Sequence, residues 1–144
     1  MHMICYMSNY TGSVEATKVL KDIVDVAKVR NKKCGITGVL FFQDGKFLQV
    51  IEGEESDLRD LMADLEKDVR HDNIDILVDT AVEMRGFNDW HMDSLALNEG
   101  QKFEADMMKS LTKNFEKNLL PRSDTLVYFY KSLLSQPTYK TQIL

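Results

Sequence analysis

The chain has 144 residues, of which 44% are hydrophobic and 28% charged, so it can bury a core and is not disordered throughout. Acidic residues outnumber basic ones by 23 to 18, which argues against a protein that neutralises nucleic-acid phosphates. Apolar runs reach only four or five residues and no signal peptide opens the chain, so we expect a cytoplasmic protein without a membrane span.

The first half of the chain alternates between strand and helix patterns. A β-type run over 1–8 predicts a strand, which polar residues 9–11 end. A helix then follows from Ser13, with apolar residues at helical spacing: Ala16, Val19, Leu20, Ile23 and Ala27. Residues 31–35 are expected to break this helix. The runs 36–42 and 46–51 flank Asp44-Gly45, which predicts a hairpin.

The second half repeats the alternation. Ser56 and Asp57 open a second helix, whose predicted apolar stripe is Leu58, Leu61, Met62, Leu65 and Val69. We expect a turn at Asp72-Asn73, a strand over 74–82, an irregular stretch over 85–89 and a last strand over 91–97.

The element order β-α-β-β-α-β-β predicts an α+β protein of the ferredoxin-like class, with a five-stranded mixed sheet and two helices on one face. The acidic excess lies within residues 1–98, whereas 99–144 are slightly basic. We therefore expect a domain over 1–98 and an extension of two amphipathic helices over 99–144, which Pro121 and Pro137 interrupt. These helices could cover the open face of the sheet or dock a partner.

Cys5 and Cys34 are the two cysteines of the chain. They have neither the spacing of a zinc site nor a second pair to complete one, so we predict no metal centre. In a cytosolic protein both are expected to be reduced thiols, buried or half-buried.

Three polar residues, Gln49, Tyr6 and Asn31, are candidates for a binding site. Period-2 alternation puts Gln49 on one face between Phe47 and Ile51, where an amide needs hydrogen-bond partners. Tyr6 lies on a strand that neighbours this one in the predicted topology, and Asn31 lies at the end of the first helix. The amides and the phenol would suit a planar heterocycle with an imide edge. Gln49 could equally bond a backbone group, and Asn31 could simply end the helix.

Four segments together resemble the BLUF family of blue-light sensors that use FAD. They are 35–40 (GITGVL), 44–53 (DGKFLQVIEG), 68–71 (DVRH) and 85–92 (RGFNDWHM), and Tyr6-Met7-Ser8 also matches the family. The similarity covers about residues 2–95 in the right order and spacing. It was the resemblance, and not periodicity, that suggested a flavin.

The resemblance implies roles for individual residues. Tyr6 would donate an electron, coupled to a proton, to the excited flavin, and Gln49 would bridge Tyr6 and the flavin N5/C4-carbonyl edge. Asn31 would hold the imide edge, and Asp68 would be a further ring-edge partner. The predicted cofactor site contains, besides these residues, Ser8, Ile23, Ile36, Phe47, Leu65, Lys67 and His71.

Asp64 departs from the family pattern, because members commonly have Arg or Lys at this position, next to the flavin C2 carbonyl. Here the contact is lost or Lys67 replaces it, or Asp64 points to solvent. The basic cluster of Lys28, Arg30, Lys32 and Lys33 is either a solvated helix end or a neighbour of the FAD phosphates. Arg70 and His71 are expected to be structural rather than catalytic.

The resemblance further implies that Trp90 and Met92 carry the light signal. We expect a non-enzymatic photoreceptor that binds FAD non-covalently and acts on a separate partner protein, with homo-oligomerisation through the tail as an option. Two alternatives are a light-insensitive ligand-binding module and a small acylphosphatase-like hydrolase. The hydrolase would need an arginine in an anion-binding loop, and the 9–12 loop has none.

Overall fold

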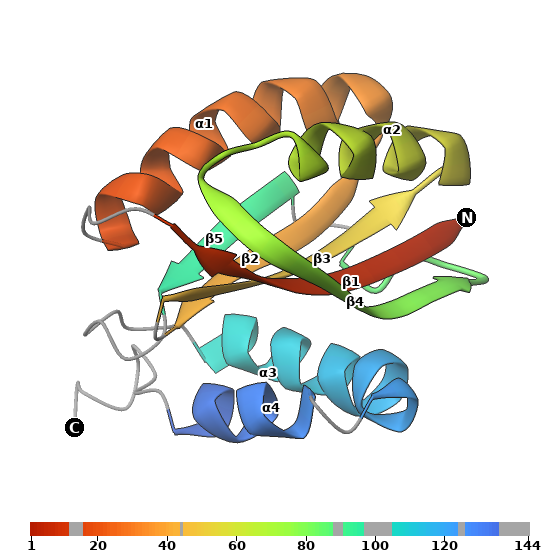
Figure 1. Cartoon of the computed structure of the whole chain (residues 1–144). Helices are drawn as coiled ribbons and strands as arrows, with labels where there is room; N and C mark the ends of the chain where they lie inside the picture. The colour runs from red at the N-terminus through yellow and green to blue at the C-terminus, as the bar shows by residue number, and fades with distance from the viewer. Residues whose placement is uncertain (12–15, 44, 88–90, 97–104, 124–125, 136–144) are drawn as a thin grey trace. The chain divides into compact units, whose positions relative to one another are not determined.

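The computed structural model describes residues 1–11, 16–43, 45–87, 91–96, 105–123 and 126–135. The chain forms two compact units, one over residues 1–96 and the other over residues 97–144. The first unit combines a sheet with two helices, and the described part of the second is helical (Figure 1). In the part of the chain that is described, no helix is both long and apolar enough to cross a membrane.

The first unit has the predicted element order. Its elements are β1 (His2–Tyr10), α1 (Ala16–Cys34), β2 (Thr37–Gln43), β3 (Lys46–Gly53), α2 (Glu55–Glu66), β4 (His71–Ala81) and β5 (His91–Ala96). The strands lie in the order β4-β1-β3-β2-β5. All neighbours are antiparallel except β2 and β5, which run parallel, so the sheet is mixed.

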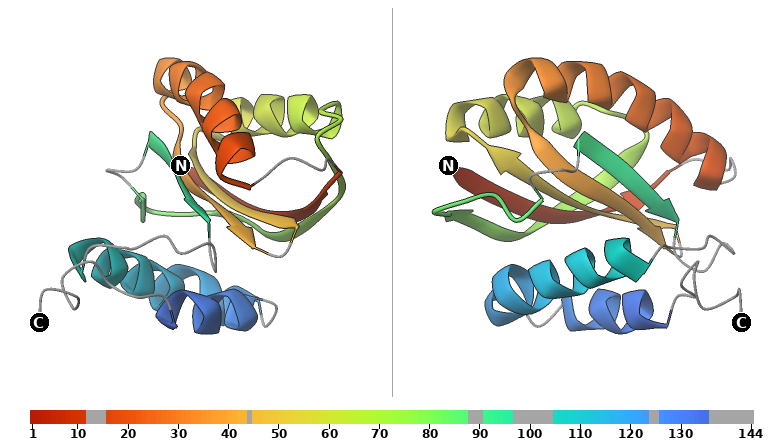
Figure 2. Two further views of the ribbon diagram at one scale, coloured as in Figure 1. Left: turned by 90° about the vertical axis from the view of Figure 1, so that its left-hand side faces the viewer. Right: turned by 180° about the vertical axis from the view of Figure 1, so that it is seen from behind.

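Helices α1 and α2 both lie on one face of this sheet (Figure 2). The α+β ferredoxin-like class is therefore confirmed. Side chains that alternate toward the helices form the core between the two layers. This core consists of Ile4, Tyr6, Ile36, Leu40, Phe42, Phe47, Ile51, Leu58, Leu61 and Met62.

The first helix ends later than the sequence pattern predicts. It continues through Cys34, so Asn31 lies inside its last turn and does not break it. Gly35, with a φ of 68°, ends the helix, because glycine adopts left-handed backbone conformations without the penalty of a Cβ atom. Cys34 is consequently exposed, contrary to the expectation of a half-buried thiol, whereas Cys5 is buried.

Two further expectations about the second half are wrong. The second helix ends at Glu66, so Val69 lies beyond the helix and is 86% exposed instead of continuing its apolar stripe. Strand β4 begins at His71, so Asp72 and Asn73 lie within it and form no turn. Asn73 has a φ of 50°, and the β1–β4 register shifts beside it. The polar pair therefore marks a β-bulge, in which Asn tolerates a positive φ.

The second unit contains α3 (Ala105–Asn114), a π-helical turn (Phe115–Leu119), a 3₁₀ turn (Leu120–Arg122) and α4 (Leu126–Leu134). Pro121 lies in the 3₁₀ turn, where the predicted helix was expected to stop. The rings of Phe115 and Tyr130 lie 6.0 Å apart, and the Tyr130 hydroxyl donates to the Glu116 carboxylate. These contacts join the two helical segments of this unit.

One charged network ties the edge strand of the sheet to its neighbours. The Arg59 guanidinium on α2 donates to both carboxylate oxygens of Asp79 on β4, at 2.6 and 2.9 Å. His2 on β1 contacts the same carboxylate at 2.5 Å. The hydrogen bonds from Arg59 and His2 lower the pKa of Asp79 to about 2. The carboxylate thus links α2, β1 and β4 while it is ionised.

A lowered pKa makes the contribution of Asp79 to stability dependent on pH. The ionised form stabilises the fold above about pH 4, and this contribution is lost as the pH falls through the pKa of the folded state. We expect Asp79→Asn to lower the melting temperature at about pH 7, because the substitution removes the carboxylate that Arg59 and His2 bind. The decrease should be only a few degrees, because the network is partly exposed to solvent. The difference from the wild type should shrink toward about pH 2.

Circular dichroism melts across this pH range measure the effect. Asp75→Asn is the matched control, because Asp75 is an exposed carboxylate on the same strand. A wild-type advantage over Asp79→Asn that persisted undiminished at the acid end would contradict the proposed link to ionisation.

Candidate functional site

A cavity of about 140 Å³ lies in the first unit, in the layer between the sheet and helices α1 and α2. Its lining combines apolar walls, two amides, a phenol, a histidine and two arginine–aspartate pairs. The lining residues are Tyr6, Val26, Ala27, Arg30, Asn31, Leu40, Phe47, Gln49, Leu61, Asp64, Leu65, Asp68, Arg70 and His71. The structure thus brings Tyr6, Asn31 and Gln49, the three polar residues singled out in the sequence, around one cavity.

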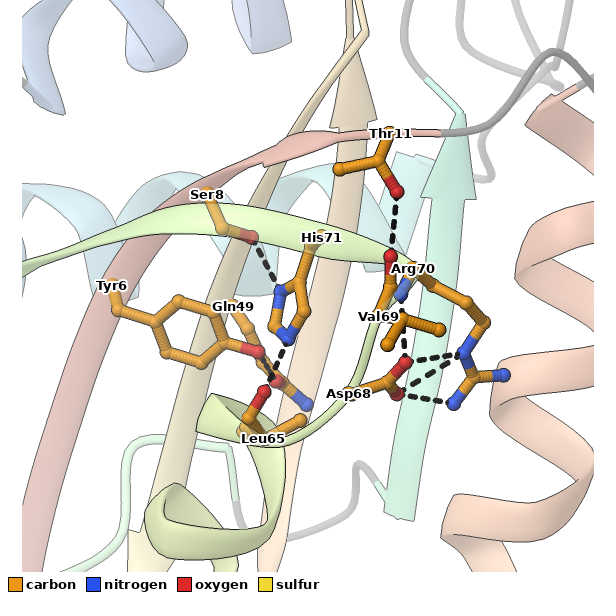
Figure 3. A network of polar contacts seen from close by, with 9 residues as sticks. All are labelled: Tyr6, Ser8, Thr11, Gln49, Leu65, Asp68, Val69, Arg70 and His71. Atoms are coloured by element: carbon orange, nitrogen blue, oxygen red, sulfur yellow. Dashed lines mark hydrogen bonds and ion pairs between the residues drawn. The ribbon is translucent and has the colours of Figure 1, made fainter.

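Tyr6 and Gln49 face each other on neighbouring strands. They are register partners in the antiparallel β1–β3 pair, and both side chains are buried (Figure 3). The Tyr6 hydroxyl donates a hydrogen bond to Gln49 Oε1. Burial, assisted by the negative charge of Asp68, raises the pKa of the Tyr6 phenol well above its ordinary value. Tyr6 therefore stays protonated, with its proton directed at the amide.

Asn31 is the anomalous group in the cavity. Its residue surface is only 1% exposed, yet neither its amide nitrogen nor its amide oxygen has a hydrogen-bond partner among the described residues. Leaving a buried polar group unpaired costs about 1–3 kcal/mol, so such groups are rare in native proteins. A ligand that presents both a donor and an acceptor to this side chain would remove the penalty.

His71 connects three elements beside this pair (Figure 3). Its Nε2 lies 2.8 Å from the Leu65 carbonyl at the end of α2, and its Nδ1 lies 2.8 Å from Ser8 Oγ on β1. A carbonyl can only accept, so Nε2 carries the hydrogen, and in the neutral ring Nδ1 accepts from Ser8. The ring also lies 6.3 Å from that of Tyr6. His71 therefore links the end of α2 to β1 beside Tyr6.

Asp68 is paired with Arg70 inside one short segment. Arg70 Nε lies 2.9 and 3.0 Å from the two carboxylate oxygens of Asp68, and the Arg70 backbone N–H adds a bond of 3.0 Å. The hydrogen bonds from Arg70 are the main cause of a lowered pKa at Asp68. Thr11 anchors the segment to the end of β1 through a hydroxyl bond of 2.7 Å to the Val69 carbonyl.

Asp64 does not simply point to solvent. Its Oδ2 lies 2.5 Å from the Arg30 guanidinium, which projects from α1. Lys67, the other option that the sequence leaves open, is exposed and is not among the residues that line the cavity. The cation beside Asp64 is therefore Arg30, which lies on α1 and not on α2. Arg30 was visible in the sequence only as part of the basic cluster.

The remaining predicted residues fall into three groups. Phe47 and Leu65 line the cavity. Ile36, just before β2, belongs to the core, and Ser8 is outside the lining but contacts the lining residue His71. Ile23 and Met92 lie on α1 and β5, but their side chains are outside the described residues, as is the whole of Trp90.

Sequence reasoning missed Leu40 and Leu61 as walls of the cavity. Leu40 is the β2 register partner of Gln49, and Leu61 precedes Leu65 by one helical turn. The same periodicities that marked Gln49 and Leu65 could have found both, because neighbours on one face of a sheet or helix enclose the same space.

Glu52 was also missed, and it organises the segment before β5. Its side chain is buried, and its two carboxylate oxygens accept the backbone N–H groups of Gly86 and Phe87 at 2.8 and 2.9 Å. Arg85 donates to Thr37 Oγ1 at 2.9 Å and to the Glu52 carbonyl at 3.1 Å. Residues 85–87 are thus fixed to the ends of β2 and β3, and β3 also carries Gln49.

Comparison with known proteins adds independent findings. The profile of the BLUF family, described as sensors of blue-light using FAD, matches residues 1–93. The photoactivated adenylate cyclase subunit beta of Euglena gracilis is 29% identical over 131 residues, which are 85% of this chain and 15% of that protein. This chain therefore spans only a small part of that curated relative.

Two solved structures share the fold. The photo-activated state of BlsA matches with a TM-score of 0.67 and 27% identity, covering 96% of this chain and 99% of that chain. BlrP1 of Klebsiella pneumoniae, solved with FMN and cyclic diGMP, matches with a TM-score of 0.64 and 28% identity, covering 85% of this chain and 30% of that chain.

The unpaired amide of Asn31 predicts that this residue lowers the stability of the ligand-free protein. Asn31→Leu removes a buried donor and acceptor that nothing satisfies, so it should stabilise the ligand-free protein by about 1–3 kcal/mol. Urea denaturation of the ligand-free protein measures this gain.

Asn114→Leu is the matched control. Asn114 is also buried in a helix, but its amide nitrogen donates to the Ser110 carbonyl at 3.0 Å and its amide oxygen accepts from Asn118. This variant should therefore be destabilised. Destabilisation by Asn31→Leu as well would show that the Asn31 amide is satisfied in solution.

Proposed function

The chain belongs to the BLUF family of sensors of blue light using FAD, and we propose that it is a photoreceptor that binds FAD non-covalently in the cavity of its first unit. BLUF domains bind flavin. The observation that carries the proposal is the buried Asn31 amide, whose nitrogen and oxygen both lack a partner in the part of the chain that the structure describes. The imide edge of a flavin, an N–H between two carbonyls, is complementary to such an amide.

The other lining residues fit the same ligand. Leu40, Phe47 and Leu61 offer apolar surfaces suited to a flat aromatic ring, and the Gln49 amide lies beside them. Asn31 and Gln49 would bind polar edges of the ring. Asp68, which Arg70 holds in place, would be a further partner at the ring edge. When bound, the flavin supplies absorption of blue light and an acceptor for one electron.

Tyr6 is the electron donor in this proposal. Its hydroxyl proton has one prepared route, along the hydrogen bond to Gln49 Oε1. Loss of an electron makes the phenol strongly acidic, so the proton leaves toward that oxygen. Gln49 then rearranges its hydrogen bonds. The raised pKa of Tyr6 supports this role, because the phenol holds its proton until the electron departs.

Two physical connections would carry a change at Gln49 toward β5. Leu40 on β2 is the register partner of both Gln49 on β3 and Ser94 on β5. Glu52, three residues beyond Gln49, holds the backbone of Gly86 and Phe87 ahead of β5. We propose that Trp90 and Met92 respond to this change and alter binding to a separate protein. Such a response requires that the segment containing Trp90 and Met92 have two arrangements of nearly equal free energy.

In this proposal the chain is a cytoplasmic sensor and not an enzyme. The alignment with BlsA covers 99% of that solved chain, so the same fold occurs in a solved chain of similar extent. The signal then passes by binding, either to a partner or to a second copy of this chain. FAD is the proposed flavin, as in the family description, while FMN accompanies the solved BlrP1 structure.

Tyr6→Phe tests the photochemical role directly. The wild-type protein with bound flavin should show a small red shift of its main visible band after blue illumination and recover in darkness. Tyr6→Phe should keep the flavin and lose the shift completely, because the phenol supplies both the electron and the proton. Absorption spectra recorded before and after illumination measure both properties.

Tyr10→Phe is the matched control, because Tyr10 lies on the same strand and packs edge-on against Phe42 and Phe47. It should retain the shift. A full shift in Tyr6→Phe would refute the assignment of Tyr6, bound flavin without any shift in the wild type would favour the light-insensitive module, and failure to bind flavin would overturn the photoreceptor proposal.

A further inference from the structure

The exposure of the lining residues shows where the cavity opens. Tyr6, Asn31 and Gln49, at the inner end, are all buried. Val26 on α1 is exposed, and the side chains of Arg30 on α1 and Asp64 on α2 are 39% and 55% exposed. The side chain of Arg70, in the segment after α2, is also 46% exposed. The lining therefore reaches solvent between the two helices, where Arg30 and Asp64 meet, and beside Arg70.

Arg30 and Asp64 form the rim pair, an ion pair of 2.5 Å that joins α1 to α2. Each member is adjacent in the chain to an inner lining residue, Arg30 to Asn31 and Asp64 to Leu65. A ring that enters on this side, between α1 and α2, passes these two side chains on its way to the Asn31 amide. The second arginine–aspartate pair, Asp68 with Arg70, differs because both of its members lie within one short segment after α2.

We propose that the rim pair is an electrostatic latch that opens to admit a flavin and closes again behind it, and so sets the rates of flavin entry and exit. This role requires that the cavity bind flavin, as proposed. An exposed ion pair contributes about 0–1 kcal/mol, so the latch opens often and slows passage only modestly. Its strength falls as salt screens the charges.

A ligand without phosphate isolates the latch from attraction between the protein and an anionic tail. Riboflavin is such a probe, and its fluorescence changes when the ring is buried. We would mix flavin-free protein with riboflavin in a stopped-flow instrument and measure the association and dissociation rates. For the wild type, both rates should rise about two- to fivefold between about 20 mM and about 500 mM NaCl.

Asp64→Asn removes the charge but keeps the shape of the side chain. Both rates of this variant should already be about two- to fivefold above the wild-type values at low salt and should no longer depend on salt. The double variant Arg30→Asp with Asp64→Arg reverses the pair, so slow and salt-sensitive passage should return. Asp60→Asn, an exposed aspartate one turn earlier on α2, should behave as the wild type.

The outcomes separate this inference from the photoreceptor proposal. Riboflavin binding with equal, salt-independent rates in the wild type and Asp64→Asn would overturn the latch and leave the photoreceptor proposal standing. Faster rates in Asp64→Asn that the reversed pair did not slow again would likewise refute pairing as the cause. No riboflavin binding by the wild type would overturn both.

Discussion

The pairing of β1 with β3 is the constraint on which the rest of the site depends. Antiparallel register sets Tyr6 opposite Gln49, and alternation turns both side chains toward the helices. A slip of either strand by one residue would send the polar group of that strand to the other face of the sheet, away from its partner. The core on the same face, with Ile4, Phe47 and Ile51, opposes such a slip, because the same shift would expose its apolar side chains. The packing of the core thus also guarantees the Tyr6–Gln49 hydrogen bond.

The polar groups of the site differ in whether the protein itself satisfies their hydrogen bonds. Tyr6, His71 and Asp68 have protein partners that orient them without a ligand. Among the described residues Asn31 has none, and the fold retains the unfavourable energy of its buried amide. In the proposed function this unpaired amide is preorganised for a ligand that offers both a donor and an acceptor. Stability and binding therefore oppose each other at this one position.

Much of the fold follows from the sequence, because each element of the first unit has a periodic pattern and a boundary signal. Asp44-Gly45 marked the hairpin correctly, and β2 and β3 pair across it. The errors lie where local signals have two meanings. Polar residues after an apolar stripe suggested that α1 breaks at Asn31, yet the helix continues to Gly35. Asp72-Asn73 has the composition of a turn, but its pairing with β1 makes it a bulge.

For the site, the sequence by itself determined that two residues are anomalous: a glutamine between two apolar neighbours and a tyrosine on the adjacent strand. These are local properties that spacing and residue type reveal, whereas Asp64 stood out only through the resemblance to the family. Only the tertiary structure decided which groups meet. Arg30 pairs with Asp64 from another helix, Glu52 holds the backbone at 86–87, and the buried Asn31 amide has no partner within the described ranges. Each of these facts depends on how distant segments pack, and a linear pattern contains no record of those distances.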